Sequence, residues 1–344
     1  MNMSPGPKKS ELVNRLNNGK PDSGAYPAAS LEMLRMRAQV LAAIRTFFHR
    51  QGVMEVETPV CSRSATTDPA IESLVTRYTG PGAPAGLPLY LHTSPEFPMK
   101  RLLAAGSGAI YQICKVFRDG ESGRLHNPEF TLLEWYRPGF DHHRLMDEVE
   151  QLVQALMSEP LAVRRISYQA LFQQQLQLDP HQASAGQLRD CALNQGVSGV
   201  DRLDLPHRDA WLDLLMTHCV EPAMGPGLCF VYDYPASQAA LSRVRPGNPP
   251  VAERFELYIN GIEVANGFHE LTDAAEQQRR FEQDLQTRSA AGQADVPMDR
   301  QLIEALSLGL PDCAGVALGI DRLIMQLAGA EQISQVLAFP LERA

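Results

Sequence analysis

The sequence predicts an α+β fold in which a mostly antiparallel β-sheet is flanked by helices. Two observations carry this prediction: short strand-like runs follow one another across turns, and longer amphipathic segments with helical spacing lie before and after them. The 344 residues are 44% hydrophobic and 21% charged, a composition that is typical of globular chains and excludes disordered and collagen-like classes. This length suits two domains or one large catalytic domain with insertions.

The first segment, residues 1–30, is interpreted as a flexible leader, because no apolar stretch follows Lys8 and Lys9 as it would in an export signal. No run of residues approaches the ~20 apolar residues that span a bilayer, so no membrane association is expected. Six cysteines without a C-x-x-C pair indicate buried thiols in the reducing cytoplasm. A net charge of −9 disfavours a protein that mainly wraps a polyanion.

A single catalytic domain is expected over residues 31–344. Its first helix, 31–51, carries Leu31, Leu34, Leu41 and Ile44 at helical spacing and stops at a glycine. The elements expected after it are a strand at 53–57, a turn or hairpin tip at 80–88, a strand at 89–92, a loop at 93–96, a helix at 97–105, strands at 109–117 and 129–138 around a polar loop, a helix at 141–157, a mostly helical Gln-rich insertion at about 160–222, strands at 228–232 and 254–265, a helix at 273–291 that begins with a D-x-x-E capping box, a strand at 314–319 and a helix at 321–328.

Several nucleotide and hydrolase motifs are absent from the sequence. It contains no G-x-x-x-x-G-K-[ST], G-x-G-x-x-G, H-E-x-x-H or G-x-S-x-G pattern. P-loop, Rossmann, zinc-protease and α/β-hydrolase functions are therefore disfavoured.

The dipeptide Asn260-Gly261 lies between two alternating runs and predicts a two-residue type I′ hairpin. In that register Tyr258 lies opposite Glu263 and Glu256 lies opposite Ala265. Glu256 and Glu263 then share a face at the diagonal distance of ~7–8 Å. Paired carboxylates suit Mg²⁺ that holds nucleotide phosphates. The alternative is two solvated carboxylates on an exposed sheet face.

On the strand at 129–138, a period of two places Phe130, Leu132, Glu134 and Tyr136 on one face. An aromatic ring there can stack on a purine, and a carboxylate beside a phenol can bind an ammonium group. Arg118, at the start of the preceding loop, offers a fork for a phosphate or carboxylate. The alternative is that Phe130 lies in a core and that Glu134 pairs with an arginine.

In Gly315–Leu323 a glycine-bearing strand runs into a helix whose first turn carries Arg322. Bare backbone and an arginine at one point suit a nucleotide phosphate. The alternative is that the glycines serve close packing and that Arg322 lies on the surface.

In this order, the segments Gly52–Pro59, Phe117-Arg118 with Phe130 and Glu134, and Gly315–Arg322 resemble motifs 1, 2 and 3 of the class II aminoacyl-tRNA synthetases. The resemblance extends from about Leu31 to Ala328 and implies the antiparallel catalytic domain of that class. Details similar to the lysine branch are Glu256, Glu263, Asn266–Leu271 and Leu133–Tyr136.

Motif 1 begins after about 50 residues, which leaves no room for the N-terminal anticodon-binding domain of a lysyl-tRNA synthetase. Together with the negative charge and the stretches His92–Glu96, His126–Thr131 and Leu133–Arg137, this resembles the elongation factor P–(R)-β-lysine ligases. That resemblance implies ATP as a substrate, Mg²⁺, activation of (R)-β-lysine or lysine, transfer to a lysine side chain of elongation factor P, a homodimer formed through motif 1, and no tRNA partner.

The resemblance also implies roles for individual residues. Arg118 would bind the α-phosphate and Arg322 the γ-phosphate as the catalytic pair, Phe130 would lie under adenine, and Tyr136 and Glu270 would hold the amino groups. The amino-acid pocket would comprise Ser94, Pro95, Glu96, Glu134, Tyr136, Asn266 and Glu270; the ATP site Arg118, Asp119, Gly120, His126, Asn127, Phe130, Glu263, Val264, Gly319 and Arg322; and the metal site Glu256 and Glu263.

The sequence departs from the family pattern at Asp119-Gly120-Glu121, where Asn-Glu-Glu is usual, so Glu121 or backbone groups would replace the carboxylate that Gly120 lacks. Ser94 stands where lysyl-tRNA synthetases usually have alanine. Two alternative functions remain: a truncated lysyl-tRNA synthetase, and a non-catalytic regulator that binds an amino acid. The regulator is disfavoured because the motif arginines and metal carboxylates are all present. The preferred lysine isomer is left open.

Overall fold

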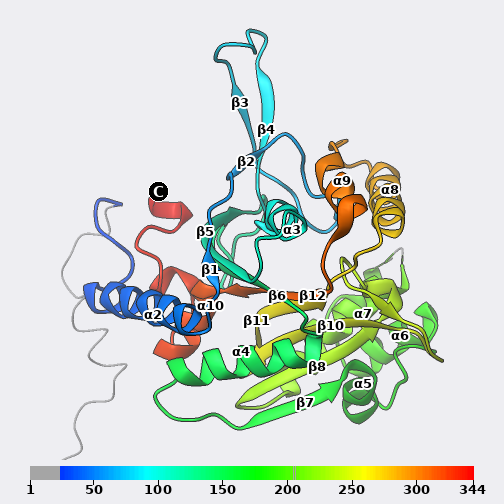
Figure 1. Ribbon diagram of the computed structural model, residues 1–344. Helices are drawn as coiled ribbons and strands as arrows, with labels where there is room; N and C mark the ends of the chain where they lie inside the picture. The colour runs from blue at the N-terminus through cyan, green and yellow to red at the C-terminus, as the bar shows by residue number, and fades with distance from the viewer. Residues whose placement is uncertain (1–23, 204, 206) are drawn as a thin grey trace, which may run out of the picture.

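The computed structural model describes residues 24–203, 205 and 207–344, and within them nine strands form one large sheet (Figure 1). The strand order is β1-β5-β6-β12-β11-β10-β8-β7, with β9 beside β10. Only the pairs β1–β5 and β7–β8 are parallel, so the predicted, mainly antiparallel α+β fold is confirmed in the described part of the chain. The strands are β1 Met54–Glu55, β5 Ile110–Phe117, β6 Glu129–Pro138, β7 Val163–Ser167, β8 Leu228–Pro235, β9 Val244–Arg245, β10 Val251–Ile259, β11 Ile262–His269 and β12 Cys313–Gly319.

A smaller sheet projects from the body of the molecule (Figure 1). It consists of β2 (Cys61–Ser62), β4 (Leu87–Leu91) and β3 (Val75–Tyr78), in that spatial order. The turn predicted at 80–88 lies at the tip of its β3–β4 hairpin.

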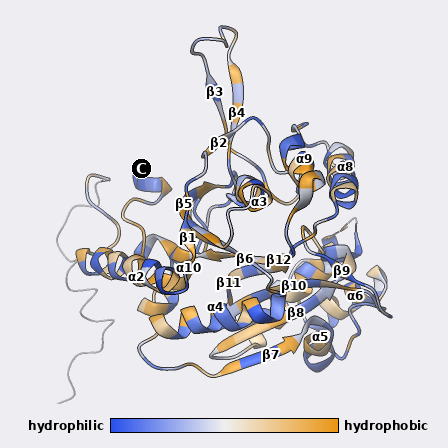
Figure 2. Ribbon diagram, in the orientation of Figure 1, coloured by the Kyte–Doolittle hydropathy of each residue, from blue (hydrophilic) through white to orange (hydrophobic). Residues whose placement is uncertain are grey.

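One face of the large sheet is covered by α2 (Leu31–Arg50), α4 (His142–Leu156) and α10 (Ile320–Ala328). In Figure 2, α2 alternates between hydrophilic and hydrophobic residues. It buries Val40, Ile44 and Phe48, which recur every four residues, and Ser30 caps its first turn by accepting a hydrogen bond from the Met33 amide. The predicted helix is thus confirmed, and its apolar stripe fixes it against the sheet.

Around the other face lie α3 (Glu96–Ala104), α8 (Ala274–Ala290) and α9 (Arg300–Gly309). The predicted start of α8 is confirmed, because the Asp273 carboxylate accepts a hydrogen bond from the Glu276 amide at 2.9 Å. The sequence analysis did not identify α9, which packs against α3 through Leu302 and Leu306.

The predicted insertion forms a second apolar cluster against β8 and β10. Its helices are α5 (Tyr168–Leu176), α6 (Ala185–Asn194) and α7 (Arg208–Leu215), with the 3₁₀ turns η1 (Val200–Arg202) and η3 (Glu221–Ala223) and the short π-helix η2 (Met216–Val220). Elsewhere in the chain, 3₁₀ turns form η4 (Ala236–Gln238), η5 (Ile333–Gln335) and η6 (Leu341–Arg343). The segment also contains strand β7, which the sequence analysis did not identify. Its hydrogen-bond partners lie some sixty residues later in β8, so local spacing does not reveal it.

The hairpin between β10 and β11 turns at Asn260 and Gly261, which both have positive φ, of 52° and 77°. The predicted turn and the pair Tyr258–Glu263 are confirmed. The predicted pair Glu256–Ala265 is wrong, because a β-bulge skips Val264 and places Asn266 opposite Glu256. Glu263 and Asn266 consequently face the same side of the sheet, although a regular strand would place them on opposite sides.

The N-terminal leader predicted over 1–30 lies mostly outside the described residues. Its end is held by backbone hydrogen bonds from Ala28 to Ala338 and from Ala29 to Leu337, next to α2. All six cysteines are free thiols. Cys229 and Cys313 are buried as expected, whereas Cys61 is exposed and the other three are partly exposed. None of the described helices is both long and apolar enough to cross a bilayer.

Candidate active site

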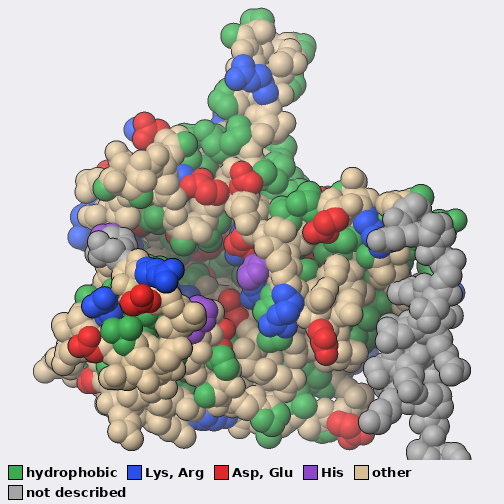
Figure 3. Space-filling model, turned by 180° about the vertical axis from the view of Figure 1, so that it is seen from behind, with side chains coloured by type: hydrophobic (Ala, Val, Ile, Leu, Met, Phe, Trp, Pro, Cys, Tyr) green, Lys and Arg blue, Asp and Glu red, His purple; other side chains and the backbone are tan. Residues whose placement is uncertain are grey.

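A cavity of about 1410 Å³ opens on the sheet face that α3 and α8 border. In Figure 3, which shows the molecule from behind, a hollow has acidic side chains on its floor and basic and histidine side chains at its rim. The strand β6 faces this cavity with Phe130, Leu132, Glu134 and Tyr136, as the period of two predicted. The cavity exceeds the ~300–1,000 Å³ of a typical single-ligand pocket, so it has room for two substrates.

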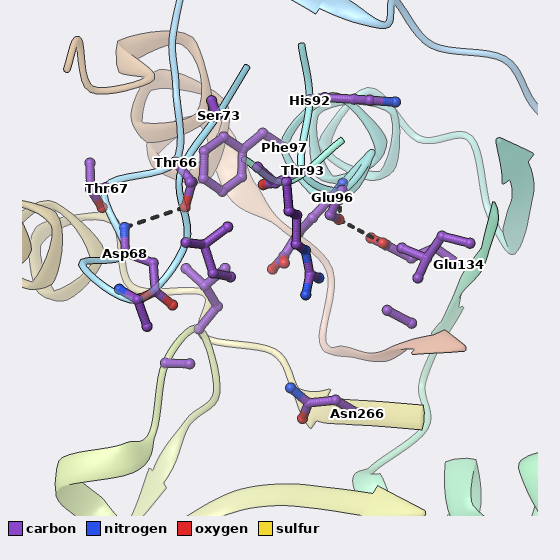
Figure 4. Close-up of a pocket in the computed structure, with 18 of the residues that line it drawn as sticks. Thr66, Thr67, Asp68, Ser73, His92, Thr93, Glu96, Phe97, Glu134 and Asn266 are labelled. Atoms are coloured by element: carbon purple, nitrogen blue, oxygen red, sulfur yellow. Dashed lines mark hydrogen bonds between the residues drawn. The ribbon is translucent and has the colours of Figure 1, made fainter. Parts of the chain in front are cut away.

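At one end of the cavity, Glu134 is held by two hydroxyl groups. Ser94 Oγ donates to Oε2 at 2.6 Å and Tyr136 Oη donates to Oε1 at 2.7 Å. Burial, followed by the charge of Glu96, raises the pKa of Glu134 to about 7. Figure 4 shows Glu134, Glu96 and Asn266 pointing into the same space from β6, α3 and β11. This end therefore offers a carboxylate whose orientation is fixed before any ligand arrives.

Lys100 lies behind this pocket and was not identified from the sequence. Its side chain is 1% exposed, and its ammonium nitrogen lies 2.6 Å from both Glu96 Oε1 and Glu270 Oε2. Burial favours a lower pKa for Lys100, but the two carboxylates outweigh it and the pKa is raised. Lys100 follows Glu96 by four residues on α3, a spacing that signals an ion pair but does not reveal Glu270 as a partner.

The second oxygen of Glu270, Oε1, has no hydrogen-bond partner among the described residues. Burial raises the pKa of Glu270 to about 8, because the opposing charge of Lys100 only partly offsets it. Gly315 packs directly against this group: a Cβ added there would collide with the Tyr136 ring and with Glu270 Oε1. A glycine at 315 is therefore needed for the pocket wall to hold its shape.

At the other end of the cavity, the guanidinium of Arg118 lies 5.2 Å from the centroid of the Phe130 ring and 3.5 Å from Glu121 Oε1. Arg118 Nε is buried and has no hydrogen-bond partner within the described part of the chain. Such an unpartnered donor, next to an aromatic face, suits an anionic ligand with a flat ring. Glu121, the residue predicted to replace the carboxylate that Gly120 lacks, lines the cavity here.

Arg322 lies beside this group at the start of α10. It donates to Glu263 O at 3.0 Å, approaches Glu263 Oε2 at 3.3 Å and lies 2.7 Å from His126 Nε2. Burial and the charge of Arg322 lower the pKa of His126, so a neutral ring accepts this bond. The two predicted catalytic arginines thus border one cavity.

The predicted metal carboxylates differ in their surroundings. Glu256 accepts hydrogen bonds from Arg254, from Tyr234 at 2.6 Å and from Tyr258 at 2.5 Å, and it does not line the cavity, whereas Glu263 does. Burial and the charge of Glu256 raise the pKa of Glu263.

Glu221, which sequence reasoning missed, completes this acidic group. Burial and the charges of Glu263 and Glu256 raise its pKa to about 7. Residue 221 comes from η3 and meets the hairpin turn at Gly261, and no sequence signal links the two segments. Mutual repulsion among oxygen donors is what a bound Mg²⁺ relieves, so these residues fit that ion.

The other predicted residues divide into two sets. Asn127, Val264, Asn266 and Gly319 line the cavity, and Asn127 is fixed by bonds to Glu129 O and from the Leu341 amide. Pro95, Asp119 and Gly120 do not line it. Asp119 instead accepts a hydrogen bond from the Gly120 amide in the turn that follows β5.

Asp321 joins the start of α10 to α2 and β6. It is 1% exposed, pairs with Arg37 of α2 at 2.5 Å and accepts a hydrogen bond from the Thr131 amide of β6 at 2.7 Å. It therefore fixes the helix that carries Arg322 relative to the strand that carries Phe130.

A family model described as tRNA synthetases class II (D, K and N) matches residues 27–343 of the chain. The match covers nearly the whole sequence and includes every residue of the cavity described above.

Proposed function

The chain belongs to the class II tRNA synthetases (D, K and N), and we propose that it activates (R)-β-lysine with ATP and transfers it to a lysine side chain of elongation factor P. As a class II synthetase domain, it is an ATP-dependent ligase domain that activates an amino acid. The identity of the amino acid and of the acceptor is the proposed part.

The observation that carries the proposal is the charge of the amino-acid end of the cavity. Three carboxylates, Glu96, Glu134 and Glu270, meet a single buried ammonium, that of Lys100. The resulting excess of negative charge suits a substrate with two ammonium groups, as lysine and β-lysine have. Glu134 and the free oxygen of Glu270 are the groups available to bind them.

The chemistry requires no nucleophile from the protein. The substrate carboxylate attacks the α-phosphorus of ATP and pyrophosphate leaves, giving an acyl-adenylate. The acceptor amine then attacks the acyl carbon, AMP leaves, and the amine nitrogen loses a proton. Arg118 and Arg322 would orient the phosphates and neutralise charge that develops on them. Mg²⁺, held by Glu263 with Glu221, would supply further charge neutralisation on the phosphates.

A protein acceptor is supported by the charge of the chain. Its net charge of −9 opposes long-range attraction of a polyanion such as tRNA. The cavity also continues past the amino-acid pocket towards Thr66, Asp68 and Asp284, which leaves a route for a long acceptor side chain. The presence of Arg118, Arg322 and Glu263 around one cavity argues against a non-catalytic regulator.

Two assays test the proposal. ATP–pyrophosphate exchange should depend on added (R)-β-lysine or lysine, and elongation factor P should then gain one lysyl mass that maps to a lysine residue. Exchange without modification of elongation factor P, but with acylation of tRNA-Lys, would establish the synthetase alternative instead. No exchange with any lysine isomer would support the regulator.

A homodimer formed through motif 1 is also proposed. Met54, within motif 1, and Leu31, in the helix that precedes it, are 50% and 65% exposed, so apolar side chains at and beside this motif lie on the surface of the single chain. Sedimentation at micromolar concentration should give twice the chain mass, and a monomer would refute this part of the proposal.

A further inference from the structure

A second group of chemically reactive side chains lies at one edge of the large sheet. Among the residues that the structure describes, His142, Glu253 and His269 each offer a ligand atom, and these atoms all lie within 4.8 Å of one another. They come from the start of α4, from β10 and from the end of β11. Residues distant in sequence meet here because antiparallel strands bring the end of β11 beside the beginning of β10.

This group is separate from the cavity. Along a strand, neighbouring side chains point to opposite faces. Arg254 and Glu270 line the cavity, so Glu253 and His269, which precede them, point to the face that α4 covers. The proposed ligase chemistry uses neither residue.

His142 is the most unusual member of the group. The residue is 1% exposed, and neither of its ring nitrogens has a hydrogen-bond partner in the described part of the chain. Its Nε2 lies 3.6 Å from Asp233 Oδ1, a buried atom that likewise has no hydrogen-bond partner there. Leaving such donors and acceptors unsatisfied costs free energy, which binding of an ion between them would recover.

The surroundings orient the remaining ligand atoms. His269 Nε2 lies 3.0 Å from Asp312 Oδ1, which leaves Nδ1 directed at Glu253 Oε2, 2.6 Å away. Arg245 binds Asp233 Oδ2 at 2.6 Å and Glu253 Oε1 at 3.2 Å. Both carboxylates therefore turn their other oxygens towards the imidazoles. A histidine backed by a carboxylate is the usual outer-shell arrangement of a metal ligand.

We propose that His142, Glu253 and His269 bind a zinc ion, with Asp233 as the fourth ligand. Two imidazoles and two carboxylates are a donor set that Zn²⁺ accepts in tetrahedral geometry and that Mg²⁺ does not prefer. Zinc bonds of about 2.0–2.1 Å place tetrahedral ligand atoms about 3.3 Å apart. Glu253 and His269 therefore separate slightly as the ion replaces their hydrogen bond. The ion would tie the start of α4 to β8, β10 and β11.

The test uses the tag-free full-length chain, stripped with a chelator and titrated with ZnCl₂ by calorimetry. Millimolar Mg²⁺ is present throughout to occupy oxygen-only sites such as that of Glu263. We expect one zinc ion per chain with a dissociation constant in the micromolar range or tighter. X-ray absorption at the zinc edge should show nitrogen and oxygen ligands that include two imidazoles, without the ~2.3 Å sulfur shell that a cysteine site would give.

Matched variants locate the site. His142→Gln removes a direct ligand and should weaken zinc binding more than about tenfold, since loss of an outer-shell partner alone typically costs that much. His143→Gln changes the exposed neighbour, which is outside the group, and should leave zinc binding unchanged. Zinc should raise the melting temperature of the wild type but not of His142→Gln. Glu253→Gln provides a second variant if His142→Gln does not fold. Unchanged affinity in the variants, sulfur ligation, or no binding by the wild type would overturn the proposal.

Discussion

The ammonium nitrogen of Lys100 lies 2.6 Å from Glu270 Oε2 and is buried with it in the wall of the cavity. The same nitrogen contacts Glu96, so one cation pairs with two carboxylates of the pocket. The pocket can therefore hold several acidic groups close together and still present Glu134 to a cationic substrate.

Replacing Lys100 by methionine should destabilise the protein. The change leaves Glu96 and Glu270 without their cation in a buried position, and breaking a buried pair in this way costs about 3–5 kcal/mol of the free energy of unfolding. Urea denaturation at neutral pH measures the loss.

Lys115→Met is the matched control, because Lys115 pairs with Glu129 at 3.4 Å and both side chains are about half exposed, at 46% and 52%. Its effect should stay below about 1 kcal/mol. Equal effects of the two variants would show that Lys100 does not neutralise the pocket.

The affinity for the amino acid should increase with pH between about 6 and 8. Glu134 and Glu270 have pKa values raised to about 7 and about 8, so at lower pH they are protonated and cannot pair with an ammonium group. Below these values the Michaelis constant of the amino acid should rise by up to about tenfold per pH unit for each carboxylate. Pyrophosphate exchange at several pH values measures it, with the Michaelis constant of ATP as the internal comparison.

The raised pKa values of Glu134 and Glu270 also predict how the stability of the protein changes with pH. Their pKa is higher in the folded protein than in the unfolded chain, so they add stability that is fully present below the unfolded value and is lost as pH rises through about 7 to 8. Between pH 6 and pH 9 the melting temperature of the ligand-free protein should fall more steeply for the wild type than for Glu134→Gln. Parallel curves would contradict the raised pKa of Glu134.

Glu263→Gln should abolish activation without loss of stability. It removes one carboxylate from a group in which Glu256 raises the pKa of Glu263 and Glu263 raises that of Glu221, so the ligand-free protein should be as stable as the wild type or more stable. Loss of a metal ligand should lower the rate of pyrophosphate exchange by orders of magnitude.

Glu256→Gln provides the contrast. Arg254, Tyr234 and Tyr258 all donate to Glu256, so the amide leaves a buried guanidinium without its counter-charge and should cost roughly 2–4 kcal/mol. If Glu263→Gln is the more destabilising of the two in thermal denaturation, the two carboxylates have the opposite roles.

Gly315→Ala should damage the amino-acid pocket selectively. The added Cβ would collide with the Tyr136 ring and with Glu270, so the Michaelis constant of the amino acid should rise at least about tenfold, with a loss of stability of about 1–3 kcal/mol from overpacking. Gly186→Ala is the control, because the nearest atom to its added Cβ is Ser184 Oγ at 4.0 Å. A normal Michaelis constant in Gly315→Ala would mean that the pocket wall moves freely.

The sequence by itself determined the features that depend on neighbouring residues. The helix predicted over 31–51 with Ile44 on its apolar face, the Asn260-Gly261 turn and the alternation along 129–138 each follow from local geometry, and all three are confirmed, although Leu31 of the predicted apolar stripe is exposed. The faces of β6, and with them the placement of Phe130 and Glu134 in one cavity, could be predicted for the same reason.

Only the tertiary structure decided which charged groups that are distant in the sequence lie close enough to interact, and which backbone segments pair. Lys100 meets Glu270, Glu221 joins Glu263, and Asp321 joins Arg37, across separations of 40 to nearly 300 residues that no periodicity encodes. The bulge at Val264 arises where β11 pairs with β10 and shifts the partner of Glu256 by one residue. Burial raises the pKa of Glu134 and Glu270, and burial is a property of the packed chain. Local sequence specifies to which face of a strand or helix a side chain points, whereas desolvation and ion pairing depend on which distant residues the completed fold places next to that side chain.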